Sequence, residues 1–303
     1  MNISQNLNTH LQLLGMAALW GASWPAARIL AQAAPPFTAG AWRFTLSVTI
    51  LLVWWFAVNR VAPKLSTKQW LGLVAGGLVG VFGYNYFFMV GVTTVPAGRA
   101  SLVVTLNPVL TTLAAAWLFK ETINRTIAVG MALAFAGAIT VLSKGNPMAL
   151  IAGDVGSGEL LLLGCSISWC AYTLMSKRLL QGMNSLTATT FTSVFGWLAL
   201  AAMSATEIAP PISSLGQLQW GAMAFLAIGS TALAYLWYFN GIARLGAGTA
   251  ASYLSIVPVF AVLGSAALLG ERIDGTLVVG GIMAVAGVMV MNWARREPAK
   301  NDL

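Results

Sequence analysis

The sequence repeats itself at a shift of 150 residues, and this internal repeat restricts the fold more than any other feature. Eight residues of the first half recur without a gap in the second half, and most are the glycine, alanine and proline residues that shape helices. The pairs are Gly91 and Gly241, Ala97 and Ala247, Gly98 and Gly248, Ala100 and Ala250, Pro108 and Pro258, Glu121 and Glu271, Gly130 and Gly280, and Gly137 and Gly287. A weaker match at a shift of 149 pairs Gly15, Trp20 and Ala22 with Gly164, Trp169 and Ala171. We therefore expect two copies of one structural unit, residues 1–147 and 148–303.

The chain is too apolar for a water-soluble domain. Hydrophobic residues make up 58% of it and charged residues 8%, with a mean hydropathy of +0.80, whereas roughly a quarter of the residues in a soluble domain are charged. A helix needs about 20 apolar residues to cross the hydrocarbon core of a bilayer. Ten such runs occur, near residues 11–31, 37–58, 70–92, 97–118, 124–143, 158–178, 185–205, 217–240, 249–269 and 274–293. We predict an all-α membrane protein of ten transmembrane helices, arranged as two inverted five-helix repeats (5+5).

The odd number of helices in each copy is the reason for this inversion. A unit of five spans begins and ends on opposite sides of the membrane, so the second copy must be inserted upside down, as in many secondary transporters. Cytoplasmic loops carry an excess of basic residues. With both termini in the cytoplasm, eleven Lys and Arg residues lie inside (Arg60, Lys64, Lys68, Lys120, Arg125, Lys177, Arg178, Arg244, Arg295, Arg296 and Lys300) and four outside (Arg28, Arg99, Lys144 and Arg272). This distribution predicts cytoplasmic termini and accounts for the net charge of +8 without nucleic-acid binding.

Motifs for enzymatic or metal chemistry are absent from the sequence. The only histidine is His10, and there is no HExxH motif, no Cys/His cluster and no phosphate-binding GxxxxGK[ST] loop. Cys165 and Cys170 are five residues apart on one predicted helix and point in different directions, so we expect packing residues and no disulfide. The first ten residues carry no Lys or Arg and run into a full-length span, so we expect that span to be retained. We expect no catalytic residue, no metal and no cofactor.

The acidic residues are informative because of where they are missing. All eight lie in predicted loops, in the tails or within a turn of a helix end: Glu121, Asp154, Glu159, Glu207, Glu271, Asp274, Glu297 and Asp302. A carboxylate inside the membrane is the usual device for carrying a proton or binding a lipophilic cation. We therefore predict transport without strong proton coupling. The matched Glu121 and Glu271 are interpreted either as gates or as ion-pairing residues that end helices.

Two spans related by the repeat carry matched hydroxyl groups and prolines. Thr105 and Ser255 stand at equivalent positions, three residues before Pro108 and Pro258 respectively, and Ser252 lies one turn before Ser255. Proline removes a backbone donor and crowds the carbonyl four residues earlier. We predict a kink at each proline, with a freed carbonyl four residues before it and the hydroxyls on the wall of a cavity. Helix packing alone is the alternative interpretation.

Aromatic side chains are candidates for the other walls of such a cavity. Trp20 and Trp169 match across the repeat near the middle of their spans, too deep for the aromatic belt at a membrane surface. The third and eighth spans, also partners, contribute Tyr84, Asn85, Tyr235 and Tyr238. These side chains form either a substrate site or part of a packed core.

Two arginines are candidate partners of an anionic group. Arg99 lies at the start of the fourth span, where the helix N-terminus is also electropositive, and we expect it to attract a substrate carboxylate. Arg43 lies about two turns into the second span, with no acidic neighbour in sequence. Each could instead extend to lipid headgroups or bond the carbonyls of a neighbouring helix.

Four segments of the chain resemble the EamA-type members of the drug/metabolite transporter superfamily. They are WGASWPAAR, FTAGAWRFTLS, PAGRASLVVTLNPVLTTLAAAWLFKETI and GAGTAASYLSIVPVFAVLGSAALLGERI. The resemblance covers nearly the whole chain and implies two inverted five-helix bundles with a central cavity, bounded mainly by spans three, four, eight and nine. It implies that spans five and ten, with Gly130, Gly137, Gly280 and Gly287, form a scaffold. Among bacterial members, the chain is similar to exporters of amino acids and related metabolites, including the aromatic amino acid and methyl viologen exporters.

The sequence therefore predicts a transporter of the bacterial cytoplasmic (inner) membrane that exports amino acids and related small metabolites. It would work by alternating access, as facilitated diffusion, with a small-molecule substrate and the lipid bilayer as its partners. Whether it acts as a monomer or a homodimer stays open. The alternatives are a proton-coupled drug or metabolite exporter, a sugar-phosphate or nucleotide-sugar exchanger, which would need several buried Lys or Arg residues, and a membrane sensor or assembly subunit that transports nothing.

Overall fold

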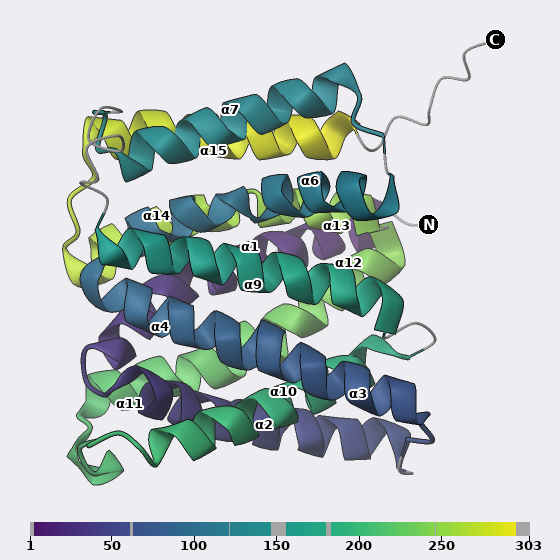
Figure 1. The fold of residues 1–303 in the computed structure, drawn as a ribbon, viewed down its shortest axis with the longest axis vertical. Coiled ribbons are helices and arrows are strands. Elements are labelled where there is room, and N and C mark those ends of the chain that lie inside the picture. Colours follow the sequence, from purple (N-terminus) through teal and green to yellow (C-terminus); the bar gives the residue numbers. More distant parts are fainter. Residues whose placement is uncertain are drawn as a thin grey trace.

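The computed structural model describes residues 3–60, 63–120, 122–146, 156–179, 183–245 and 247–294, which form helices and the loops between them (Figure 1). The helices of the first half are α1 (Ile3–Ala31), α2 (Pro36–Asn59), α3 (Thr67–Gly76), η1 (Gly77–Gly83), α4 (Tyr84–Thr94), α5 (Ala97–Val103), η2 (Val104–Leu106), α6 (Asn107–Phe119) and α7 (Arg125–Leu142). Those of the second half are α9 (Ser157–Leu179), α10 (Ser185–Ser204), η3 (Ile212–Ser214), α11 (Gln217–Ala224), η4 (Phe225–Leu233), α12 (Ala234–Leu245), α13 (Ala247–Leu254), α14 (Val257–Leu269) and α15 (Gly275–Ala294).

Nine helical spans within the described residues are long and apolar enough to cross a membrane, by length and composition. Some of them are composite, because π or 3₁₀ turns join their α-helical parts, as in Thr67–Thr94, Ala97–Phe119 and Gln217–Tyr238. α1 is 29 residues long but is not among the nine, and its first turns carry several polar residues. The described ranges contain no strand. The expected all-helical fold with five spans in each half is confirmed.

Short polar motifs begin several of these helices. Ser66 and Gln69 form a capping box at the start of α3, in which the Ser66 hydroxyl accepts from the Gln69 N–H at 3.3 Å and the Gln69 side chain accepts from the Ser66 N–H at 3.0 Å. Asn124, Asn184 and Asp274 accept the backbone N–H three residues later at 2.7–2.8 Å, where α7, α10 and α15 begin. Each cap satisfies an N–H group that has no partner within its helix.

Equivalent spans of the two halves pair with each other across the molecule. α7 packs along α15 at one end of the long axis, and α2 packs along α10 at the other end (Figure 1). The first span of each half crosses into the opposite half, since α1 packs against α12 and α14 while α9 packs against α4 and α6. This exchange places α1 and α9 in the middle of the bundle and joins the halves into one body.

The α7–α15 pairing depends on backbone contact at glycines that match across the repeat. A Cβ atom added to Gly137 would lie 2.5 Å from the carbonyl oxygen of Gly280, and one added to Gly287 would lie 2.5 Å from that of Gly130. Small residues allow membrane helices to approach this closely, and close packing is a main source of their association. The two helices form the scaffold pair that the sequence predicts.

The fourth and ninth spans are both interrupted just before their prolines. The 3₁₀ turn η2 separates α5 from α6, which has Pro108 in its first turn, and a turn at residues 255–256 separates α13 from α14, which has Pro258 in its first turn. The expected free carbonyl at Val104 is absent, because the backbone N–H of Asn107 donates to it in the 3₁₀ turn. A tighter turn thus replaces the bond that the proline removes.

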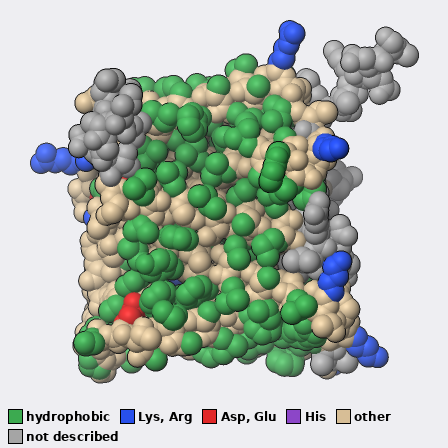
Figure 2. Space-filling view, viewed as in Figure 1, with side chains coloured by type: hydrophobic (Ala, Val, Ile, Leu, Met, Phe, Trp, Pro, Cys, Tyr) green, Lys and Arg blue, Asp and Glu red, His purple; other side chains and the backbone are tan. Residues whose placement is uncertain are grey.

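The surface of the bundle has the distribution expected for a membrane-spanning protein. Figure 2 shows a face covered largely by hydrophobic side chains, with Lys and Arg side chains mainly along one edge. At that edge α1 begins and α15 ends (Figure 1), and we call it the termini edge. The helices run between the termini edge and the opposite edge, so the membrane normal lies along them.

Candidate functional site

Trp20 of the first half meets two tyrosines of the second half in the middle of the bundle. Its ring centroid lies 5.3 Å from that of Tyr235, edge to face, and 5.4 Å from that of Tyr238. The indole N–H donates to the backbone carbonyl of Ser230 at 2.8 Å. The crossing of α1 into the second half brings these rings together.

Trp169 makes the corresponding contact in the other direction. Its ring centroid lies 5.5 Å from that of Tyr84 in the first half and 5.9 Å from that of Tyr172 on its own helix. Tyr84 also stacks on Phe88, with the centroids 5.9 Å apart. Each half therefore contributes one tryptophan to the aromatic group of the other.

Arg43 is near one tyrosine of each aromatic group. Its guanidinium is within electrostatic reach of both Tyr84 and Tyr235, and its Nη1 donates to the side-chain oxygen of Asn85 at 3.2 Å. The Nε atom is inaccessible and has no hydrogen-bond partner. We call Trp20, Arg43, Tyr84, Asn85, Trp169 and Tyr235 the central cluster.

The polar side chains of the central cluster are not fully sealed off. Arg43, Tyr84 and Tyr235 are half-buried, and each keeps some accessible surface. Arg43 is the eighth residue of α2, about 10 Å from the start of that helix at 1.5 Å per residue, too deep for its charge to be an ordinary surface charge.

Two π-helical segments position the tyrosines. η1 ends directly before Tyr84 and Asn85, and η4 ends at Leu233, two residues before Tyr235. In η4 the Thr231 hydroxyl donates to the Leu226 carbonyl, five residues earlier, at 2.9 Å. π segments inside α-helices often occur at functional sites. Sequence reasoning missed both, because a π turn keeps the apolar pattern of its helix; the only hint was the high glycine content of span three.

The π segments occupy equivalent places in the two halves. η1 packs against α9 and α10, while η4 packs against α1 and α2. In η1 an added Cβ at Gly77 would lie 2.7 Å from the Thr192 carbonyl oxygen of α10, and one at Gly80 would lie 2.4 Å from the Tyr172 ring of α9. The π segments are therefore among the parts of the third and eighth spans that contact the opposite half.

Several residues predicted for the site lie elsewhere. The structure brings Arg99 to Asp274 at 3.1 Å rather than to the aromatic rings. It turns the Ser255 hydroxyl toward Asn292 of α15, which donates to it at 3.2 Å. The Thr105 hydroxyl donates to the Leu102 carbonyl of its own span at 2.5 Å. Ser252 is partly accessible on α13.

Arg43 is the residue that sequence reasoning undervalued. Burial and partners decide the role of a membrane arginine, and neither can be read from one span. The structure gives Arg43 a hydrogen bond to buried Asn85 in place of lipid headgroups, and none of the ion pairs among the described residues includes it. The signal in the sequence was its depth in the span without an acidic neighbour.

Glu271 closes the bundle at the edge opposite the termini. Its carboxylate accepts from the backbone N–H groups of Ala97 and Gly98 at 2.8 and 3.0 Å, and Arg28 lies 3.6 Å away. Arg28 also donates to the Val95 carbonyl. The contact joins α1, the start of α5 and the loop before α15. The matching residue Glu121 lies outside the described residues.

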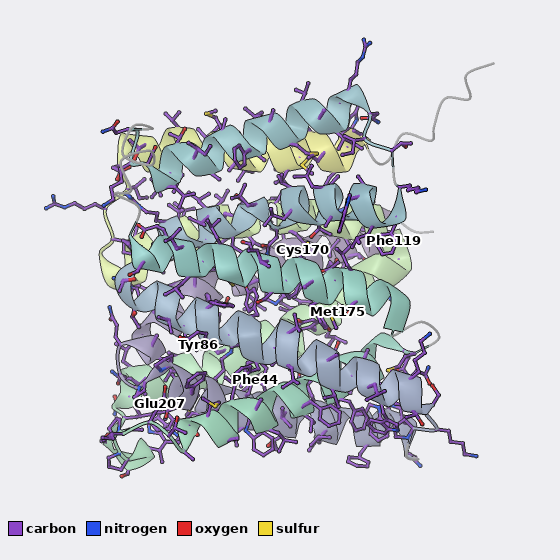
Figure 3. The ribbon with its side chains drawn as sticks, viewed as in Figure 1. Phe44, Tyr86, Phe119, Cys170, Met175 and Glu207 are labelled. Carbon is purple, nitrogen blue, oxygen red and sulfur yellow. The ribbon has the colours of Figure 1, made fainter. Side chains whose placement is uncertain are left out.

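Glu207 makes a similar contact at the same edge. It accepts from the backbone N–H groups of Phe37 and Thr38 at 3.1 and 2.7 Å, and from the Thr38 hydroxyl at 2.8 Å, at the start of α2 (Figure 3). A carboxylate is stabilised by the free N–H groups of a helix start. Two acidic residues of the second half thus bind helix starts of the first half, and these contacts join the two halves at this edge.

No group of three or more His, Cys, Asp or Glu side chains that could hold a metal occurs among the described residues. Cys165 and Cys170 are free and buried. The chemistry of the central cluster is therefore that of one guanidinium, one amide and aromatic rings. Such a set can bind and orient a small molecule.

Comparison with known proteins places this chain among transporters. The model of the EamA-like transporter family matches residues 7–143 and again residues 156–293. The uncharacterized transporter YyaM of Bacillus subtilis (strain 168) is 27% identical over 298 residues, covering 98% of this chain and 97% of that protein. A probable amino-acid metabolite efflux pump of Salmonella typhimurium (strain LT2) is 25% identical over 288 residues, with 91% of each chain covered. One solved structure, 21% identical, matches 96% of this chain and 99% of its own with a TM-score of 0.65, and bears on the fold alone.

Proposed function

Since the chain belongs to the EamA-like transporter family, we propose that it exports amino acids and related small metabolites through the central cluster. It is a multi-pass membrane transporter, and its relatives are transporters and not enzymes. The observation that carries the proposal is that Arg43 is near one tyrosine of each of two aromatic groups, one around Trp20 and one around Trp169. Aromatic walls and one charged group suit a small metabolite with an apolar body. The name of the Salmonella relative supports the same substrate class.

We propose that transport proceeds by alternating access. The contacts of Glu271 and Glu207 hold the opposite edge together, and rocking of the halves would break them while the central cluster stays within the membrane. The π segments η1 and η4 lie where the halves touch and are the expected points of bending. The matched interruptions before Pro108 and Pro258 would serve the same movement.

We propose the bacterial cytoplasmic membrane as the location, with the termini edge in the cytoplasm. The excess of Lys and Arg in loops at this edge supports the orientation. Labelling of single cysteines placed at Lys68 and at Lys144, in a variant without Cys165 and Cys170, would test it in intact cells. A membrane-impermeant thiol reagent should reach position 144 and leave position 68 unlabelled.

Counterflow in proteoliposomes tests the transport proposal. Vesicles loaded with unlabelled phenylalanine should accumulate labelled phenylalanine without any ion gradient, and Trp169→Ala and Tyr84→Ala should abolish the accumulation. Trp117→Ala is the matched control, because this tryptophan is 81% exposed near a span end. Absence of saturable counterflow for amino acids and related acids alike would overturn the proposal and favour a sensor or assembly subunit.

We propose facilitated diffusion because the described acidic residues stand at helix ends and loops, away from the central cluster. Proton-coupled transport would need a group that gains and loses a proton within the membrane. A sugar-phosphate exchanger would need several buried cations, and Arg43 is the one described cation at the central cluster.

A further inference from the structure

We propose that the substrate is a monocarboxylate with an apolar or aromatic body and no free ammonium group, and that its carboxylate binds Arg43. The proposal rests on the transport function proposed above and restricts its substrate class to the related acids without an ammonium group, so phenylalanine would be a weaker substrate than such an acid. It is carried by the geometry around the guanidinium and by the charges of the whole central cluster.

Arg43 has unused capacity to bind an anion. Arginine carries five N–H donors in a planar fork that matches the two oxygens of a carboxylate. The described structure gives this guanidinium one hydrogen bond, from Nη1 to Asn85 at 3.2 Å, and leaves the enclosed Nε without a partner. A buried donor without a partner is costly, and a charged one more so. A carboxylate that reaches the guanidinium would accept hydrogen bonds from it and neutralise its charge.

The amide of Asn85 fixes the direction of the guanidinium. Its Nδ2 donates to the Val81 carbonyl in η1 at 2.7 Å, so its Oδ1 is presented to Arg43. The Ser47 hydroxyl donates to the Arg43 carbonyl at 3.1 Å and lies 3.4 Å from the Thr231 hydroxyl of η4. The guanidinium is thereby linked to η1 through Asn85, while the next turn of α2 contacts η4 through Ser47.

Among the described residues, no carboxylate lies at the central cluster to pair with an ammonium group. Glu207 is bound at the start of α2 and Glu271 at the start of α5, and the Asn85 oxygen accepts from Arg43. Aromatic faces attract cations, but the positive charge of Arg43 repels an ammonium group brought close to it. A zwitterion would therefore have its carboxylate paired with Arg43 and its ammonium group repelled by the same residue.

The rest of the central cluster suits the apolar body of such an acid. Trp20 packs on Tyr235 and Trp169 packs on Tyr84, and both tyrosines are within electrostatic reach of Arg43. Flat rings at this spacing accept an aromatic or branched aliphatic group by edge-to-face or offset contact. Arg43 would bind the carboxylate of the substrate, and the aromatic rings would contact its apolar part.

Three probes with the same phenyl body separate the charge requirements: 3-phenyllactate (a carboxylate with a hydroxyl group), phenylalanine (a zwitterion) and 2-phenylethylamine (a cation). Binding to the purified protein in lipid nanodiscs is measured by titration calorimetry at pH 7.5. We expect phenyllactate to bind at least about tenfold more tightly than phenylalanine, and phenylethylamine not to bind. Arg43→Gln should weaken phenyllactate binding about 10- to 100-fold, the range for a lost charge-assisted hydrogen bond, and Arg43→Lys should weaken it less.

Arg125→Gln is the matched control, because Arg125 is exposed at the start of the scaffold helix α7, and it should bind phenyllactate like the parent chain. The preference among the three probes needs no variant, so it decides the proposal even if Arg43→Gln fails to fold. Equal or tighter binding of phenylalanine, or unchanged phenyllactate binding in folded Arg43→Gln, would overturn the carboxylate proposal. If phenylalanine still shows counterflow, the transport function survives that result. Failure of all three probes to bind or to be transported would overturn both.

Discussion

Trp20 and Tyr235 stand 215 residues apart in the chain, and their ring centroids are 5.3 Å apart in the fold. The contact joins the two halves at the depth of Arg43. Trp20 also fixes the η4 segment through its bond to the Ser230 carbonyl. The pair therefore has two roles, one in lining the central cluster and one in holding the π turn.

These roles predict different effects for two substitutions of Trp20. Trp20→Ala removes the ring and should weaken substrate binding at least about tenfold, since a buried aromatic anchor contributes about 2 kcal/mol or more. Trp20→Phe keeps a ring beside Tyr235 but loses the bond to Ser230, and should have a smaller effect. Calorimetry with 3-phenyllactate measures both. Equal binding by Trp20→Ala and the parent chain would exclude Trp20 from the site.

The scaffold contact predicts a clear difference between glycines of α7 and α15. Gly137→Ala and Gly287→Ala place a Cβ 2.5 Å from a backbone carbonyl oxygen of the opposite helix, and such overpacking costs about 1–3 kcal/mol. Gly275→Ala is the control, because no atom lies within 4 Å of the added Cβ. Thermal unfolding in detergent should show a lower midpoint for Gly137→Ala and Gly287→Ala than for the parent chain. The midpoint of Gly275→Ala should equal that of the parent chain. A midpoint for Gly137→Ala equal to that of Gly275→Ala would contradict the contact.

Glu271→Gln should loosen the start of α5. The substitution removes the charge that the Ala97 and Gly98 N–H groups and Arg28 share. Hydrogen exchange followed by mass spectrometry should show faster exchange at residues 97–98 and unchanged exchange in the middle of α15. Glu159→Gln, in the first turn of α9, is the control. Unchanged exchange at residues 97–98 would mean that Glu271 does not hold this edge closed.

Asp274 gives a pH dependence with a defined sign. The Thr276 hydroxyl, the Leu277 N–H and Arg99 lower the pKa of Asp274 below its ordinary value of 3.8. A carboxyl whose pKa is lower in the folded chain stabilises it fully above the unfolded pKa and loses that contribution as the pH falls through the folded pKa. The contribution should therefore be constant near pH 7 and decline below about pH 4.

Two substitutions separate the contributions of Asp274. Asp274→Asn keeps a helix cap and loses the exposed ion pair with Arg99, so at pH 7 it should cost less than about 1 kcal/mol. Asp274→Ala also removes the cap and should cost about 1 kcal/mol more. Thermal unfolding between pH 7 and pH 3 checks both, and the parent chain should approach Asp274→Asn at the acid end. An Asp274→Asn chain less stable than Asp274→Ala would contradict the capping role.

An anionic substrate predicts that the membrane potential drives export. One negative charge moved out of a negative interior gains about 2.3 kcal/mol per 100 mV. Proteoliposomes loaded with 3-phenyllactate and given an interior-negative potassium diffusion potential should release it faster than vesicles without a potential. A pH gradient alone should have little effect at constant substrate charge. Release that follows the pH gradient and ignores the potential would contradict uniport of the anion.

The sequence predicted the spans well because the bilayer limits what a span can be. Ten apolar runs of the right length, and an odd number in each repeat, leave few arrangements. The family resemblance implied that spans five and ten pair, and their glycines at residues 130, 137, 280 and 287 agree with the close backbone contact that the structure shows. The length of an apolar run, its hydrophobic pattern and the size of its residues are local properties, and they can be predicted from the sequence alone.

The candidate site was predicted only in part, because partners decide what a polar side chain does. Trp20, Trp169, Tyr84 and Tyr235 meet because α1 and α9 cross between the halves, and the repeat alone does not require that crossing. Arg99 was preferred to Arg43 since nothing in one span reveals that Arg99 has Asp274 as its partner. Val104 was expected to keep a free carbonyl, and a 3₁₀ turn supplies its partner.

The crossing of α1 into the second half also affects how the protein is made. α1 ends at Ala31, and its partner α12 begins at Ala234, so about 200 residues must be synthesised before that partner exists. At roughly 5–20 residues per second, this interval lasts about 10–40 s. During that time the first helix to leave the ribosome must stay in the membrane or in its insertion machinery without its neighbours from the second half.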